Sequence, residues 1–144
     1  MTYLGLDFGE KRIGVANSDE LALMAHPLPF LEHRSDDQVM GAICRLVEEH
    51  GAEKIVVGLP RTMRGEIGLQ AKVVLAFVDR LKEKTRCEVV TWDERLTSAE
   101  AEKTLLAQDV SRAKRKVRRD ALAAQITLQS YLDFMSREKD VKDA

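Results

Sequence analysis

Apolar residues recur at every second position near the start of the chain, which is the period of half-buried β-strands. Leu4, Leu6 and Phe8 follow this spacing in segment 2–8, and segment 12–18 repeats it. We therefore predict two strands at these positions, joined as a hairpin by the short connection between them.

The rest of the chain alternates between strand-like and helix-like patterns. One helix is marked at both ends, because Ser35 and Gln38 have the spacing of a capping box and Gly51 stands just past the last turn. The other predicted elements are, in chain order, a proline-containing edge strand or loop at 23–30, a buried strand at 54–57, a helix around 74–81, a strand at 87–92, a helix from about 97 to 107 and a last helix from about 116 to 135.

A hairpin followed by strands and helices in alternation predicts an α/β domain, in which helices flank a mixed sheet whose later strands are parallel. With 144 residues, 44% of them hydrophobic, the chain can build one core, and we expect a single domain at 1–136. The tail at 137–144 is mostly charged and is predicted to be disordered. No segment approaches the run of about 18 apolar residues that spans a membrane, so a soluble, cytoplasmic protein is expected.

Three acidic residues stand where a predicted strand ends or a predicted helix begins: Asp7, Glu94 and Asp120. In a sheet of this kind ligands bind at the carboxyl ends of the parallel strands, and all three residues are predicted to meet at that edge. Carboxylate oxygens are the ligands that Mg²⁺ and Mn²⁺ prefer, so the trio predicts a metal site. Each residue alone has a simpler explanation, in a turn, an ion pair or a helix start, but their convergence favours the metal site.

Positive charge is concentrated just before Asp120. The chain has a formal net charge of −1, but residues 111–119 carry six Lys or Arg and no acid. A basic run of this kind is typical of a contact with a phosphate backbone, although it also fits a solvated helix face. Acidic and basic residues side by side favour a polyanion that lies across a divalent cation.

Four short motifs follow one another along the chain. They are, in order, Leu4 to Ala16 (LGLDFGEKRIGVA), Val57 to Pro60 with Met63 and Gly65, Asp93 to Ser98 (DERLTS), and Lys114 to Lys116 with Asp120, Ala123 and Ala124. Together they resemble the YqgF/RuvX family of bacterial proteins, over roughly residues 3–133. The resemblance implies a ribonuclease-H-like fold and a nuclease that matures the 5′ end of the small-subunit ribosomal RNA precursor. Family members are also regarded as Holliday junction resolvase homologues.

The resemblance further implies two-metal hydrolysis of a phosphodiester, with Mg²⁺ or Mn²⁺ as cofactor. It carries the acidic site onto Asp7, Glu94 and Asp120, and we predict Asp7 as the bridging ligand with the other two as outer ligands. It places Lys11, Arg12, Lys114, Arg115 and Lys116 near the nucleic acid, and we predict further contacts from Met63, Arg64 and Arg95. The loop after Pro60 reads RTMRG and departs from the usual Leu-Asn-Met-Asp-Gly pattern of the family.

Three other functions stay open. A Holliday junction resolvase would act on branched DNA, and it cuts two strands symmetrically, which usually requires a dimer. The sequence shows no exposed apolar seam, so a monomer or a weak homodimer is expected. A ribosome-assembly factor that binds nucleic acid without cutting it would keep the same residues. The hairpin around Asp7 also resembles the phosphate-binding hairpin of the actin and sugar-kinase superfamily, but that class needs two such domains around its nucleotide.

Overall fold

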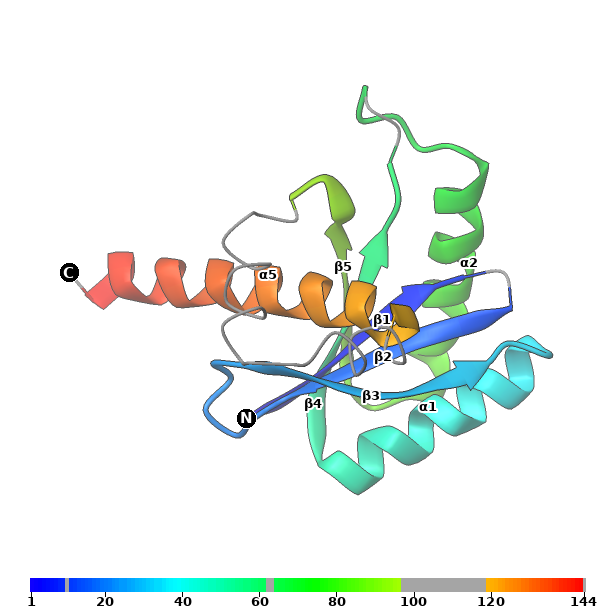
Figure 1. Cartoon of the computed structure of the whole chain (residues 1–144), viewed down its shortest axis with the longest axis horizontal. Helices are drawn as coiled ribbons and strands as arrows, with labels where there is room; N and C mark the ends of the chain where they lie inside the picture. Colours follow the sequence, from blue (N-terminus) through cyan, green and yellow to red (C-terminus); the bar gives the residue numbers. More distant parts are fainter. Residues whose placement is uncertain (10, 62–63, 97–118, 144) are drawn as a thin grey trace.

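A mixed sheet lies at the centre of the computed structural model, which describes residues 1–9, 11–61, 64–96 and 119–143 (Figure 1). The elements are, in chain order, β1 (Thr2–Phe8), β2 (Arg12–Ser18), β3 (Ala25–Glu32), α1 (Asp36–His50), β4 (Ala52–Leu59), α2 (Leu69–Lys84), β5 (Glu88–Asp93), the 3₁₀ turn η1 (Glu94–Leu96) and α5 (Arg119–Asp143). The strand order in the described part of the chain is β3-β2-β1-β4-β5. β1 is antiparallel to β2 and parallel to β4, and β4 is parallel to β5.

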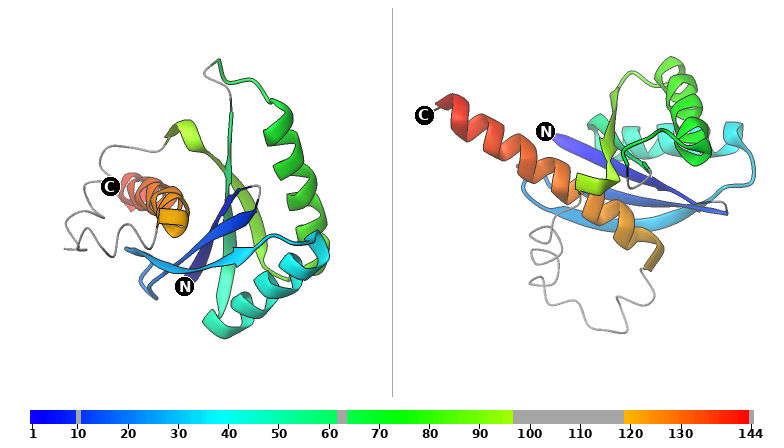
Figure 2. Two further views of the ribbon diagram at one scale, coloured as in Figure 1. Left: turned by 45° about the vertical axis from the view of Figure 1, so that its right-hand side comes forward. Right: turned by 90° about the horizontal axis from the view of Figure 1, so that it is seen from above.

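Helices cover both faces of the sheet (Figure 2). α1 and α2 pack on one face, and α5 crosses the other over β2, β3 and β1. Side chains of β1 alternate between the two layers, because Leu4 and Leu6 join the core under α1 and α2, whereas Tyr3 joins the core under α5. By the same alternation Gly5 and Asp7 lie on the face that α5 covers, which we call the α5 face.

The predicted α/β architecture, a mixed sheet flanked by helices, is confirmed. The hairpin forms as predicted, and the proline-containing strand β3 lies at the sheet edge. Ser35 caps α1, since its hydroxyl accepts a hydrogen bond from the Gln38 N–H at 3.2 Å, and Gly51 ends the helix with a φ of 61°. The helix predicted from about 97 to 107 lies outside the described residues.

The last helix runs further than the sequence predicts. An end near Met135 is expected, but α5 continues to Asp143, so the tail predicted to be disordered at 137–144 is helical as far as that residue. Residues 136–143 contain neither Gly nor Pro, so nothing in the sequence stops the helix. Its end (red in Figure 1) projects beyond the sheet, and the domain boundary at residue 136 stays a prediction. Neither α5 nor any other helix of the described residues is long and apolar enough to cross a membrane.

Close packing fixes where α5 lies on the sheet. A Cβ placed on Gly5 would sit 2.8 Å from the Leu128 Cβ and 3.1 Å from the Ala124 carbonyl oxygen, so the helix rests directly on the strand backbone. The buried Gln129 side chain accepts a hydrogen bond from the Ala25 N–H at 2.9 Å. A buried polar contact of this kind stabilises one position of the helix, because any shift would leave it unpaired.

Candidate active site

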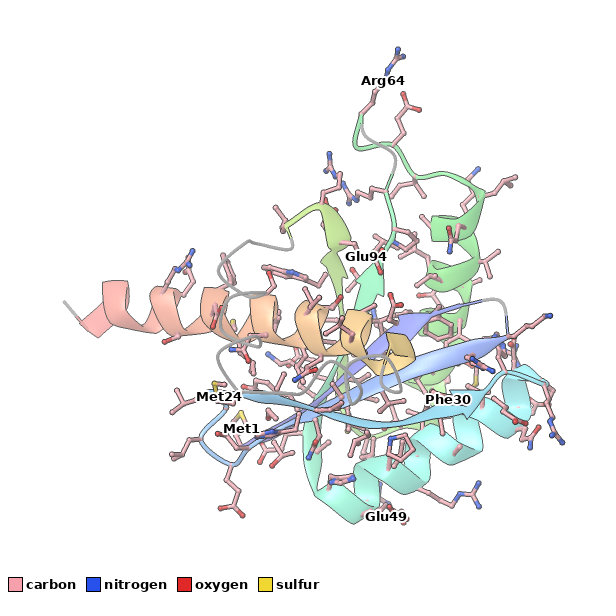
Figure 3. The ribbon with its side chains drawn as sticks, in the orientation of Figure 1. Met1, Met24, Phe30, Glu49, Arg64 and Glu94 are labelled. Atoms are coloured by element: carbon pink, nitrogen blue, oxygen red, sulfur yellow. The ribbon has the colours of Figure 1, made fainter. Side chains whose placement is uncertain are left out.

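Two carboxylates from different strands meet on the α5 face of the sheet. Asp7 lies near the end of β1, and Glu94 is the first residue of η1, directly after β5. A hydrogen bond joins the two side chains. Figure 3 shows Glu94 among the side chains at this end of the sheet. Because β4 lies between β1 and β5, Glu94 has to reach across a whole strand to contact Asp7.

Gly58, on β4, leaves room for this reach. A Cβ placed on Gly58 would lie 2.7 Å from the Glu94 Oε1 and 3.3 Å from its Cγ, so the glutamate side chain passes directly over the glycine. Any other residue at this position would displace the carboxylate. The sequence-based prediction assigns no role to Gly58, although a glycine inside an apolar strand often marks such a close approach.

The neighbourhood of Asp7 changes the ionisation of Glu94. Partial burial raises the pKa of Glu94 to about 8, and the hydrogen bond to Asp7 and its negative charge act in the same direction. Without a cation, the pair therefore holds a proton near neutral pH. Two carboxylates that converge in this way fit a hard divalent cation such as Mg²⁺ or Mn²⁺, which would neutralise both.

The raised pKa predicts that the metal-free protein loses stability as the pH rises. A carboxyl group that ionises at a higher pH in the folded state than in the unfolded state stabilises the fold at low pH, and this contribution is lost between the two pKa values. The free energy of unfolding in EDTA should fall between about pH 5 and pH 8, by on the order of 1–2 kcal/mol from this group, since solvent screens a half-buried carboxyl. Urea unfolding of the wild type and Glu94→Gln measures this, because the substitution should remove the decline.

Glu83→Gln provides the matched control, because Glu83 is exposed on α2. The free energy of unfolding of the Glu83→Gln variant should equal that of the wild type at every pH. A difference between the wild type and Glu94→Gln that stays constant across the range would show that Glu94 ionises at its ordinary pKa.

The two neighbours of Glu94 pair with each other. Asp93 accepts a hydrogen bond from the backbone N–H of Arg95 at 2.9 Å and from the Arg95 Nη2 at 2.7 Å. The Nε of Arg61, on the loop after β4, lies 3.8 Å from the Asp93 Oδ2. The side-chain hydrogen bonds from Arg95 hold the pKa of Asp93 below its ordinary value. Asp93 thus shapes the turn from which Glu94 extends.

Where they pack together, α5 and β1 run in opposite directions. The rings of Tyr131 and Tyr3 pack edge to face, with centroids 6.2 Å apart, and Leu128 packs over Gly5. Moving towards the start of α5 therefore means moving towards the end of β1, where the acidic pair lies.

Asp120 belongs to the first turn of α5. It precedes Ala124, which lies over Gly5, by one helical turn, or about 6 Å along the helix. Asp7 follows Gly5 by about 7 Å along the strand. The backbone therefore brings position 120 towards the Asp7 end of β1. Among the side chains that the structure describes, which exclude that of Asp120, no three His, Cys, Asp or Glu form a metal-binding group.

The predicted nucleic-acid contacts are spread over several elements. Lys11 is exposed in the turn between β1 and β2, and the Arg12 guanidinium lies over the Phe30 ring, 4.7 Å from its centroid. Arg64 stands at the tip of the loop between β4 and α2 and points away from the body (Figure 3). The predicted contacts outside the described residues are Met63, Lys114, Arg115 and Lys116.

Similarity to known proteins covers nearly the whole chain. A sequence model of the RuvX family, described as Holliday junction resolvase, matches residues 1–134. The chain belongs to the RuvX family. Relatives of this RuvX chain include a protein of Desulforudis audaxviator, 44% identical over 133 residues, which are 92% of this chain and 94% of the relative. Another, from Chloroflexus aggregans, is 49% identical over 132 residues, 92% of this chain and 93% of the relative. Both carry the name "Putative pre-16S rRNA nuclease".

Solved structures agree with the fold of the RuvX chain. RuvC of T. thermophilus, in complex with a Holliday junction substrate, aligns with a TM-score of 0.62 at 17% identity over 93% of the RuvX chain and 96% of its own. The Fowlpox virus resolvase, in complex with Holliday junction DNA, aligns with a TM-score of 0.51 at 9% identity over 96% and 98%. The family resemblance and the ribonuclease-H-like fold predicted from sequence are confirmed.

Proposed function

We propose that this chain is a metal-dependent nuclease that hydrolyses phosphodiester bonds at the Asp7–Glu94 pair. The observation that carries the proposal is the reach of Glu94 across Gly58 to Asp7. Two carboxylates held together repel each other once both are ionised, which opposes folding. A bound divalent cation removes that repulsion, so the arrangement is understandable as a metal site.

Asp7, Glu94 and Asp120 are the residues that would hold Mg²⁺ or Mn²⁺, with Asp7 as the bridging ligand and the other two as outer ligands. Two such ions, when bound, lower the pKa of the attacking water and stabilise the leaving oxygen. Asp7 and Glu94 present their oxygens at the end of the sheet, and Gly58 keeps the space above β4 free for them. No histidine is assigned as an acid or a base.

We propose that the substrate is the precursor of 16S ribosomal RNA, cut during maturation of its 5′ end. The support is the name shared by relatives that are 44% and 49% identical to this chain. Cleavage of Holliday junctions is the second candidate, and the description of the family favours it. The two substrates are different polymers, so one assay separates them.

The proposed function predicts that Asp120→Asn is a poor nuclease. The assay offers the wild type an RNA fragment that spans the 5′ end of the precursor and a four-way DNA junction. With Mg²⁺ or Mn²⁺ the wild type should cut one of them, and EDTA should stop the reaction. Asp120→Asn should lower the cleavage rate at least about 100-fold, because a ligand of the metal is lost.

Asp79→Asn is the matched control, since it removes one exposed carboxylate from α2 and should cut at the wild-type rate. Equal rates for Asp120→Asn and the wild type would exclude Asp120 from the site. Salt-sensitive binding of either polymer, with no cutting in any metal, would instead support an assembly factor that only binds nucleic acid.

A further inference from the structure

An arginine ties the loop after β4 to the turn that carries Glu94. We call the described part of this loop beyond Pro60 the arm, which comprises residues 61 and 64–68. A Cβ placed on Gly65 would lie 2.9 Å from the Arg95 Nη1, 3.2 Å from its Nη2 and 3.3 Å from its Cζ, so the guanidinium packs directly against the arm. Gly65 has a φ of 84°, a conformation that favours glycine. The backbone at this point therefore favours glycine, and a larger residue would push the Arg95 guanidinium away.

Asp93 holds Arg95 in this position. Its Oδ2 accepts hydrogen bonds from the Arg95 Nη2 at 2.7 Å and Nε at 3.1 Å, a two-pronged contact of the kind that orients a guanidinium. Arg61 approaches the same Oδ2 from the base of the arm, at 3.8 Å. The Asp93 side chain is only 15% exposed, whereas the Arg95 and Arg61 side chains are 39% and 36% exposed, so solvent reaches the arginine side of this cluster.

We propose that Asp93, Arg95 and Gly65 form a latch that holds the arm beside the Asp7–Glu94 pair, and that Arg61 and Arg64 of the arm bind the phosphate backbone of a polynucleotide. Asp93 is then a positioning residue that acts through Arg95. Arg95, predicted from the sequence to contact the nucleic acid, serves the latch instead.

Charge is the reason for assigning the arm a phosphate ligand. A carboxylate pair repels a polyanion, so cations on a neighbouring element have to hold the substrate strand. The arm rises from the carboxyl end of β4, the strand that Glu94 crosses, and presents Arg64 to solvent at its tip (Figure 3). Arg61 is partly exposed at its base, with 36% of its side chain accessible. This choice of ligand rests on the proposed function, whereas the latch rests on the geometry alone.

The latch reverses the effect that charge alone predicts for one substitution. Removing a negative charge next to a bound polyanion normally strengthens binding. Asp93→Asn removes such a charge, yet the latch predicts weaker binding, because a neutral amide cannot hold the guanidinium with two charge-assisted hydrogen bonds. The asparagine keeps an oxygen for the backbone N–H of Arg95, so the turn that positions Glu94 is retained.

Fluorescence anisotropy with a labelled single-stranded RNA and a labelled four-way DNA junction, in EDTA, measures binding without cleavage. Asp93→Asn should weaken binding about threefold to tenfold. Arg95→Lys should weaken it by a similar factor, because lysine keeps the positive charge but lacks the paired N–H donors of the guanidinium. Arg64→Gln should weaken binding and lower the slope of log K against log salt by about 1. The control Asp79→Asn should bind as tightly as the wild type or slightly more tightly.

The double variant Asp93→Asn/Arg95→Lys should bind no more weakly than either single variant, because both lose the same contact. Equal melting temperatures of the variants would show that the loss is not unfolding. Unchanged or tighter binding by Asp93→Asn, or losses that add in the double variant, would overturn the latch even if the protein is a nuclease. If the wild type binds neither polymer, both the proposed function and the assignment of a phosphate ligand to the arm are wrong.

Discussion

Asp7→Asn should abolish metal-dependent cleavage while the protein stays folded. The rate should fall by a factor on the order of 10³ or more, about 4 kcal/mol in the activation barrier, because the proposed bridging ligand becomes neutral. The asparagine can donate a hydrogen bond to Glu94, so the repulsion between the two carboxylates disappears. At pH 8 in EDTA the variant should therefore melt at the wild-type temperature or up to about 4 °C higher. Cleavage rates and thermal unfolding measure the two effects.

Metal binding gives Asp7→Asn an independent readout. Mn²⁺ should raise the melting temperature of the wild type in a concentration-dependent way, because it binds only the folded state, and this gain should vanish in the variant. Asp79→Asn should match the wild type in both assays. Near-normal cleavage by Asp7→Asn would exclude Asp7 as a ligand, and a melting temperature many degrees lower would attribute the lost activity to unfolding instead.

Gly5→Ala should destabilise the protein although it adds only one methyl group. Its Cβ would meet the Leu128 Cβ at 2.8 Å and the Ala124 carbonyl oxygen at 3.1 Å, so either α5 or β1 has to move. Forcing extra volume into a packed contact costs about 1–3 kcal/mol, and backbone atoms place this case at the upper end. Urea unfolding measures the loss. Cleavage should fall as well, because α5 carries Asp120.

Gly41→Ala is the matched control for Gly5→Ala. Gly41 lies inside α1, and nothing lies within 4 Å of its Cβ position. The same added methyl should therefore stabilise the protein there by about 0.5–1 kcal/mol, through helix propensity. If Gly5→Ala is as stable as Gly41→Ala, α5 does not rest on the backbone of β1.

Local patterns were enough to predict most of the fold. Alternation at period two defined the hairpin, and Ser35 and Gly51 marked the ends of α1, because these signals depend on neighbours in sequence. The predicted end of α5 was wrong because it also relied on a local pattern. A drop in apolar residues after Met135 looked like a helix end, but charged residues also form helices when neither Gly nor Pro interrupts them.

The candidate site was predictable only in outline. The rule that ligands bind at the carboxyl ends of parallel strands brought Asp7 and Glu94 to one edge. That Glu94 crosses β4 depends on the strand order, which no local window contains, so the role of Gly58 was missed. The packing of Arg95 on Gly65 joins distant segments, so no local window indicates it, and the nucleic-acid contact assigned to Arg95 stays a prediction.

The packing of α5 on β1 also determines when the candidate site can be completed during synthesis. The strand that carries Asp7, β1, precedes α5 in the chain and therefore leaves the ribosome before it. Until α5 has docked over Gly5, a growing chain lacks the contact that brings position 120 to the Asp7 end of β1. Under the proposed function, a nascent or truncated chain that ends before residue 119 lacks Asp120 and has no nuclease activity, so catalysis begins only after α5 is made.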